Sequence, residues 1–230
     1  MMHSPFIVAL DMSTEAEVKR MLGRLSPTLC RVKVGKELFT NLGPKVIQLC
    51  HKAGYEVFLD LKFHDIPNTC AQAVKAAARH GVWMVNVHAS GGPVMLAAAK
   101  DALAGFDAPP KLIAVTVLTS MSQAQLSAVG CDRFIADQVS FLAKLSQDVG
   151  LDGVVCSAEE ASHLRLECGS EFCLVTPGIR PEAAALHDQT RVATPKQAMT
   201  AGAHYLVVGR PVTASADPRE ELTRLINDLV

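Results

Sequence analysis

Short apolar runs of strand length recur along the whole chain, and this recurrence limits its fold more than any other feature. They occupy residues 6–11, 31–35, 56–62, 84–90, 111–119, 153–157, 172–176 and 205–210. Most of the runs are continuously apolar rather than alternating, which is typical of parallel strands covered on both faces. Segments rich in Ala and Leu, with the apolar spacing of a helix, follow them at residues 14–25, 37–53, 68–80, 92–104, 134–149, 158–167, 195–202 and 217–229.

Eight strands, each followed by a helix, predict an α/β protein with the (β/α)8 architecture of a TIM barrel. The 230 residues fit one such barrel, which often needs about 250 residues. No linker, low-complexity tract or charge run divides the chain, so we expect a single domain over residues 1–230. Two connections have additional features: a short extra helix is expected near residues 122–129, and residues 177–194 are a candidate lid. A doubly wound open sheet is the alternative.

Composition excludes several classes of partner. The chain has 22 basic and 23 acidic residues, a net charge of −1, and therefore no basic excess for binding nucleic acid. No apolar run approaches the roughly 20 residues that cross a bilayer, and the N-terminus lacks the pattern of a signal peptide. The seven cysteines are odd in number and form no Cys-x-x-Cys pair, which disfavours a disulfide framework or a zinc site. We expect a cytoplasmic protein without a membrane or nucleic-acid partner.

Polar residues gather at the C-terminal ends of the predicted strands, where barrels of this type place their chemistry. The residues concerned are Asp11, Lys33, Asp60, Lys62, His88, Thr119, Ser120, Gly209 and Arg210. Each one alone has a structural explanation: Asp11 could cap a helix, and Lys33 could extend its charge from a strand edge into water. Their recurrence at one end of successive strands favours a functional site.

The segment LDLKFHDIPNT, residues 59–69, is the most informative. Asp60 and Lys62 are two residues apart on a strand, so their side chains face the same way. An aspartate beside a lysine favours the charged form of both groups. Asp65 follows at the start of the next predicted helix, where Pro67 suits the first turn. By spacing alone, a structural salt bridge with a helix-capping carboxylate explains the segment as well as a catalytic array does.

Within that segment, DLKFHDIPNT at residues 60–69 resembles the signature of the orotidine 5′-phosphate decarboxylase family. Six further blocks match in order: ALD at 9–11, KVG at 33–35, VTVLTS at 115–120, TPGIR at 176–180, DQTRVATP at 188–195 and VVGR at 207–210. The resemblance implies a homodimeric barrel that decarboxylates orotidine 5′-phosphate to uridine 5′-phosphate in pyrimidine biosynthesis. It also implies active sites shared between subunits, with no metal and no organic cofactor.

The resemblance further implies roles for individual residues. Lys62 would donate the proton within an alternating charge array made of Lys33, Asp60, Lys62 and Asp65. Asp65 and Thr69 would enter the site from the other subunit.

The remaining residues would hold the substrate. Asp11 and Lys33 would bind the ribose hydroxyls, Asp60 would lie near the substrate carboxylate, and Thr119 or its neighbour Ser120 would contact the pyrimidine. The group that would hold the phosphate and close the lid is Arg180, Gln189, Gly209 and Arg210.

Two other functions stay open. Sugar-phosphate decarboxylases and aldolases of the same barrel superfamily use Mg²⁺ and share the Asp-x-Lys-x-x-Asp array. They rank second because the IPNT, LTS and PGIR segments fit the pyrimidine enzyme. A non-catalytic phosphate-binding barrel is the third interpretation, and the presence of all four array residues argues against it.

Overall fold

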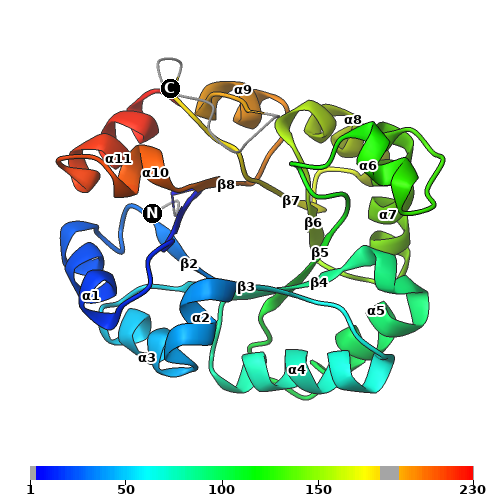
Figure 1. Cartoon of the computed structure of the whole chain (residues 1–230), viewed down its shortest axis with the longest axis horizontal. Helices are drawn as coiled ribbons and strands as arrows, with labels where there is room; N and C mark the ends of the chain where they lie inside the picture. The colour runs from blue at the N-terminus through cyan, green and yellow to red at the C-terminus, as the bar shows by residue number, and fades with distance from the viewer. Residues whose placement is uncertain (1–3, 182–191, 230) are drawn as a thin grey trace.

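A computed structural model describes residues 4–181 and 192–229 of the chain. Eight parallel strands form a closed barrel in sequential order, with helices around it (Figure 1). The strands are β1 (Phe6–Ala9), β2 (Arg31–Gly35), β3 (Val57–Phe63), β4 (Met84–His88), β5 (Lys111–Val115), β6 (Gly153–Val155), β7 (Cys173–Thr176) and β8 (Tyr205–Val208). Pairing of β1 with β8 closes the ring, which confirms the predicted barrel and rules out the open sheet.

The helices alternate with the strands and pack on the outside of the barrel. They are α1 (Glu15–Arg24), α2 (Lys36–Leu42), α3 (Lys45–Lys52), α4 (Pro67–Arg79), the 3₁₀ turn η1 (Ala89–Gly91), α5 (Gly92–Asp101), α6 (Gln123–Ala128), α7 (Ile135–Asp148), α8 (Ala158–Cys168), α9 (Pro195–Thr200), α10 (Arg210–Thr213) and α11 (Pro218–Asn227). None of the helices in the described ranges is both long enough and apolar enough to cross a bilayer.

Two apolar cores follow from strands that are buried on both faces. The larger core lies between the barrel and the helices, and it includes Phe6, Val8 and Val32. The smaller core fills the barrel itself with Ile7, Ala9, Phe58, Met84, Ile113, Cys173, Val175 and Val207. Neighbours along β1 therefore face opposite cores, as the two-residue period of a strand requires. The barrel is filled by side chains and is not a pore.

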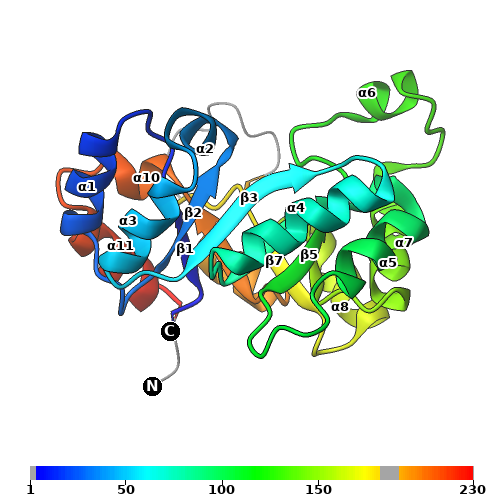
Figure 2. The same cartoon turned by 90° about the horizontal axis from the view of Figure 1, so that it is seen from below.

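One predicted helix is wrong. Residues 37–53 form two helices, α2 and α3, because Gly43 ends the first with a φ of 59° and Pro44 starts the second. Glycine reaches that left-handed conformation without strain, and proline lacks the N–H that a continuing helix would need. The extra helix expected near residues 122–129 is confirmed as α6, which stands beyond the end of the barrel (Figure 2).

Five strands end earlier than the apolar runs suggested: β1, β4, β6 and β8 by two residues and β5 by four. β1 stops at Ala9 and β5 stops at Val115, so Asp11, Thr119 and Ser120 belong to the following loops. Loops at this end of the barrel carry side chains to the site without breaking the strand ladder.

At the opposite, N-terminal end of the barrel, an arginine plug is formed by Arg31, whose side chain packs between the aromatic rings of Trp83 and Tyr205. The guanidinium carbon of Arg31 lies 4.3 Å from the ring centre of Trp83 and 5.3 Å from that of Tyr205. Glu56 forms an ion pair with Arg31 Nε at 2.8 Å. The cation–π contacts and the ion pair together stabilise a buried charge that would otherwise be costly.

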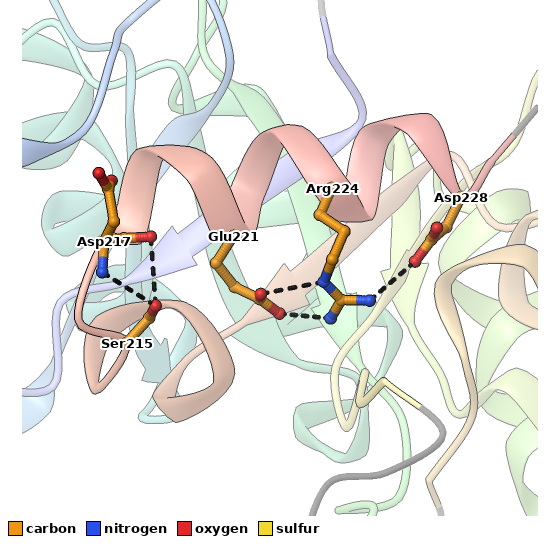
Figure 3. Close-up of polar contacts among 5 residues, drawn as sticks. All are labelled: Ser215, Asp217, Glu221, Arg224 and Asp228. Carbon is orange, nitrogen blue, oxygen red and sulfur yellow. Dashed lines mark hydrogen bonds and ion pairs between the residues drawn. The ribbon is translucent and has the colours of Figure 1, made fainter.

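Helix α11 packs beside α10, and the polar side chains on its outer face contact one another (Figure 3). The Asp217 side chain accepts hydrogen bonds from the backbone N–H groups of Arg219 and Glu220, which caps the helix. Arg224 forms ion pairs with Glu221 and Asp228 at 2.6 and 3.3 Å. These pairs at helical spacing are exposed, so each adds only a few tenths of a kcal/mol.

Candidate functional site

A cavity of about 300 Å³ opens at the C-terminal end of the barrel. Its walls come from strands and loops around the ring, so residues far apart in the sequence meet there. Charged side chains line two parts of it: Asp11, Lys33, Asp60 and Lys62 on the side of β1 to β3, and Arg180 and Arg210 on the side of β7 and β8. Apolar residues such as Val155 and Val207 also line the cavity. This combination suits a ligand with an apolar ring and an anionic group.

The buried carboxylate of Asp60 is held between two lysine ammonium groups. Its Oδ1 lies 2.6 Å from Lys62 Nζ, and its Oδ2 lies 3.1 Å from Lys33 Nζ. Lys33 Nζ also lies 3.9 Å from Asp11 Oδ1. The four side chains therefore form a chain of alternating charge that runs along the cavity wall, with Lys62 at one end.

The charge state of Asp60 follows from these contacts. Burial alone would raise the pKa of this carboxyl, but the charges of Lys33 and Lys62 and the hydrogen bonds from Lys62 and Asn86 lower it to about 2. Asp60 is thus ionised at neutral pH. Burial, the neighbouring His64 and nearby lysines lower the pKa of His88 to about 4, so this imidazole adds no charge at neutral pH.

A test of this charge cluster uses the variant Asp60→Asn. A carboxylate with a lowered pKa stabilises the fold above its unfolded pKa of 3.8, and it loses that contribution as the pH falls through the folded value near 2. The free energy of unfolding of the native chain, relative to the variant, should therefore fall by about 2 kcal/mol between pH 6 and pH 2. Urea titrations at several pH values measure the difference, and a constant difference would contradict the cluster.

Lys62 has an unusual backbone conformation. Its φ is 52°, and it is the one non-glycine residue with a positive φ in the described ranges. The β3–β4 ladder also shifts here: Leu59 pairs with Val85, but the next pair is Phe63 with Val87. Between these two pairs, three residues of β3 lie opposite one residue of β4, which is a bulge. Such local strain is often found at functional sites.

Asn86, on β4, fills the gap that the bulge creates. Its Oδ1 accepts a hydrogen bond from the backbone N–H of Lys62 at 2.8 Å, and its Nδ2 donates to Asp60 Oδ1 at 2.7 Å. Asn86 is fully buried. Asn86 was not among the site residues predicted from the sequence. An asparagine inside the apolar run MVNVH was nevertheless a signal, because a buried amide needs hydrogen-bond partners.

The side of the cavity near β7 and β8 carries two arginines that could bind an anion. Arg180 is 8 % exposed, and burial together with the nearby Arg210 cation lowers the pKa of its guanidinium. Two adjacent cations at one side of a cavity repel each other unless an anion joins them. Gly209 precedes Arg210, and a side chain there would approach Asp11 Oδ2 at 3.4 Å. Glycine therefore leaves the space between the two charged regions open.

The structure brings most of the predicted site residues together. Asp11, Lys33, Asp60, Lys62, Thr119, Arg180, Gly209 and Arg210 all line the cavity, and Ser120 lines it beside Thr119. Asp65 and Thr69 do not line it: both are exposed at the start of α4, and Asp65 Oδ1 accepts a hydrogen bond from the N–H of Ile66 at 2.7 Å. Gln189 lies outside the described residues.

In the described ranges, no group of three or more His, Cys, Asp or Glu side chains is arranged to hold a metal ion. All seven cysteines are free, and six of them are buried.

Comparisons with known proteins show the family to which this chain belongs. Residues 4–225 match the family described as "Orotidine 5'-phosphate decarboxylase / HUMPS family". The orotidine 5′-phosphate decarboxylase of Saccharophagus degradans is 54% identical over 223 residues, which cover 97% of this chain and 94% of that protein. The enzyme of the same name from Hahella chejuensis is also 54% identical, over 97% of this chain and 96% of its own length.

A solved structure has the same fold over nearly its full length. The crystal structure of orotidine 5′-phosphate decarboxylase from Lactobacillus acidophilus superimposes with a TM-score of 0.87 at 42% identity. The match covers 98% of this chain and 99% of that one.

Proposed function

Because this chain belongs to the orotidine 5′-phosphate decarboxylase / HUMPS family, we propose that it decarboxylates orotidine 5′-phosphate to uridine 5′-phosphate in pyrimidine biosynthesis. The observation that carries the proposal is the placement of Lys62 beside Asp60 and Lys33 on one wall of a cavity that presents two arginines on another. A nucleotide with a carboxylate on its ring and an anionic phosphate matches that distribution of charge.

Lys62 is the proposed catalytic cation. When the bond between C6 and the carboxylate breaks, its electron pair stays on C6 while CO₂ leaves. That carbanion lacks a good conjugated sink, so a fixed positive charge nearby is the remaining way to stabilise it. The Lys62 ammonium supplies this charge, then transfers a proton from Nζ to C6, and the neutral amine regains a proton from solvent. Preorganised electrostatic stabilisation of this kind is usually the largest catalytic contribution.

Asp60, Lys33 and Asp11 support this role. The Asp60 carboxylate forms an ion pair with the Lys62 ammonium at 2.6 Å and so holds this cation in place. We propose that Asp11 and Lys33 bind the ribose hydroxyls, since both line the cavity on the same side as Lys62. Thr119 or Ser120 is proposed to contact the pyrimidine from the loop after β5.

Arg180 and Arg210, with Gly209, are proposed to hold the phosphate, and Gln189 is expected to join them. Arginine recognises phosphate through charge-assisted hydrogen bonds, and phosphate sites after strands 7 and 8 are common in such barrels. Binding energy from this remote group can organise the reacting centre and close a loop over it.

The variant Arg210→Ala tests the phosphate site. We expect kcat/KM for orotidine 5′-phosphate to fall roughly 10- to 150-fold, the value of a hydrogen bond to a charged group. The nucleoside orotidine, which lacks the phosphate, should lose little. Arg224→Ala is the matched control, because Arg224 pairs with Glu221 and Asp228 on the outer face of α11. An equal loss on both substrates would contradict the assignment.

We propose that the active protein is a homodimer in which Asp65 and Thr69 serve the site of the partner. Both are exposed and lie outside the cavity of their own chain, although Asp65 is only three residues from Lys62. Next to Asp65, the apolar side chain of Ile66 is 67% exposed, which suits a covered surface. A cytoplasmic location is proposed as well, since seven free thiols fit a reducing compartment.

The reaction itself is tested by ultraviolet absorbance during incubation with orotidine 5′-phosphate and excess EDTA. Conversion to uridine 5′-phosphate under these conditions supports the proposal, including the absence of an essential metal. Activity that EDTA abolishes would favour the Mg²⁺-dependent sugar-phosphate enzymes of the superfamily. No spectral change at micromolar enzyme, with or without Mg²⁺, would favour a binding protein.

A further inference from the structure

We propose that Asn86 is a positioning residue for this decarboxylation, and that it holds both the backbone and the counterion of Lys62 in the geometry the reaction needs. The inference rests on the proposed function and extends it to a residue that would not touch the substrate. Three observations support it: the bulge in β3, the two hydrogen bonds of the Asn86 amide, and the complete burial of that amide.

The bulge leaves Lys62 without a regular ladder partner. Between the pairs Leu59–Val85 and Phe63–Val87, β3 has two residues more than β4, so its backbone departs from the sheet at Lys62. A buried N–H without a partner is unfavourable. The Asn86 side chain provides the acceptor, at 2.8 Å, that the neighbouring strand does not.

The same amide also reaches the counterion of Lys62. Nδ2 donates to Asp60 Oδ1 at 2.7 Å, and this oxygen is the one that Lys62 Nζ contacts at 2.6 Å. These contacts form a closed ring: the Lys62 backbone N–H bonds to the Asn86 amide, the amide bonds to the Asp60 carboxylate, and the carboxylate contacts the Lys62 ammonium. The position requires a group that donates from one atom and accepts with another, without a charge of its own. Asparagine has that chemistry, whereas leucine has neither function and aspartate has no donor when ionised.

The ring fixes the direction of the ammonium. A φ of 52° is unfavourable for a lysine, and such a conformation persists only where the surroundings impose it. Asn86 is 0 % exposed, so water does not substitute for its amide. Without the amide, the backbone at Lys62 can relax and Asp60 loses one of its donors. Both changes move the ammonium away from its position beside C6.

The test compares Asn86→Leu with the native chain. We expect kcat for orotidine 5′-phosphate to fall about 100-fold, which is the effect of displacing a catalytic group by about 1 Å. The Kd for uridine 5′-phosphate, measured by calorimetry, should stay at the native value because ribose and phosphate contacts are untouched. Thr116→Val is the matched control: it removes another buried hydrogen bond, from Thr116 Oγ1 to the Val155 carbonyl at 2.9 Å, away from the lysines. This control should lose stability but keep its kcat.

Two results would overturn the inference. One is a native kcat in Asn86→Leu; the other is a loss of kcat accompanied by an equal loss of nucleotide affinity, as a general structural defect would produce. A native enzyme that does not decarboxylate orotidine 5′-phosphate would instead contradict the proposed function, and the inference with it. An active native enzyme with an unaffected variant contradicts the inference alone.

Asn86→Asp keeps the test decisive if the leucine variant does not fold. The introduced carboxyl would face Asp60 and Lys62 on β3, Lys33 on β2 and His88 on β4. Two adjacent carboxylates share a proton, and in that state the new group can donate to Asp60 as the amide does. The ratio of variant to native kcat should therefore rise as the pH falls from 8 to 5. A ratio that does not change with pH would contradict the positioning role.

Discussion

Replacing Lys62 with alanine is expected to lower kcat for orotidine 5′-phosphate by roughly 10⁴- to 10⁷-fold, because the change removes the stabilising cation and the proton donor together. The fold should survive. The Lys62 side chain is 27 % exposed and lies at the end of β3, outside both apolar cores. Asp60 keeps its ion pair with Lys33 and its hydrogen bond from Asn86, so the remaining carboxylate is not left alone.

Single-turnover measurements at high enzyme concentration give the residual rate of this variant. Circular dichroism and the Kd for uridine 5′-phosphate confirm that the barrel and the nucleotide site are intact. Lys19→Ala is a suitable control, since Lys19 pairs with Glu15 on the surface of α1. A loss of less than about 100-fold, the lower end for general acid catalysis alone, would mean that Lys62 is not the proton donor.

Mixing two inactive variants is expected to restore activity if the sites are shared between subunits. Lys62→Ala and Asp65→Ala should each be nearly inactive as homodimers. In a hybrid dimer, the chain that keeps Lys62 receives an intact Asp65 from its partner, so one of the two sites is complete. Random association of equal amounts makes half of the dimers hybrid, and about one quarter of all sites should then be active.

Coexpression with two different affinity tags allows the hybrid dimers to be purified and assayed. The control pairs Lys62→Ala with a chain carrying both Lys62→Ala and Asp65→Ala, which forms hybrids with no complete site. Purified hybrids of the first kind that remain inactive would show that Asp65 serves its own chain or has no catalytic role.

The topology of the barrel could be predicted because each strand is covered on both faces. Burial on two sides makes a strand continuously apolar, and eight such runs separated by helical segments leave few folds to choose from. The strand ends were less accurate. Hydrophobicity continues past Ala9 and Val115, but the ladder stops where neighbouring strands end, which depends on their register. The break at Gly43 and Pro44 was missed because the apolar spacing continues across it.

The candidate site, too, could be predicted from the sequence only in part. The contact between Asp60 and Lys62 follows from two residues of separation on one strand, which local sequence reveals. The role of Asn86 depends on a bulge in a different strand, so no local pattern contains it. The placement of Asp65 and Thr69 in a partner's site concerns a surface between chains, and only the family resemblance suggests it.

The arginine plug described above has a consequence for the order of events in catalysis. With Arg31 held between Trp83 and Tyr205, and the inner core packed above it, the described part of the barrel opens to solvent through the cavity at its C-terminal end. Substrate, carbon dioxide and nucleotide product must all pass the same rim. The product therefore leaves through the opening by which the substrate arrived, so the next substrate cannot bind until the product has left.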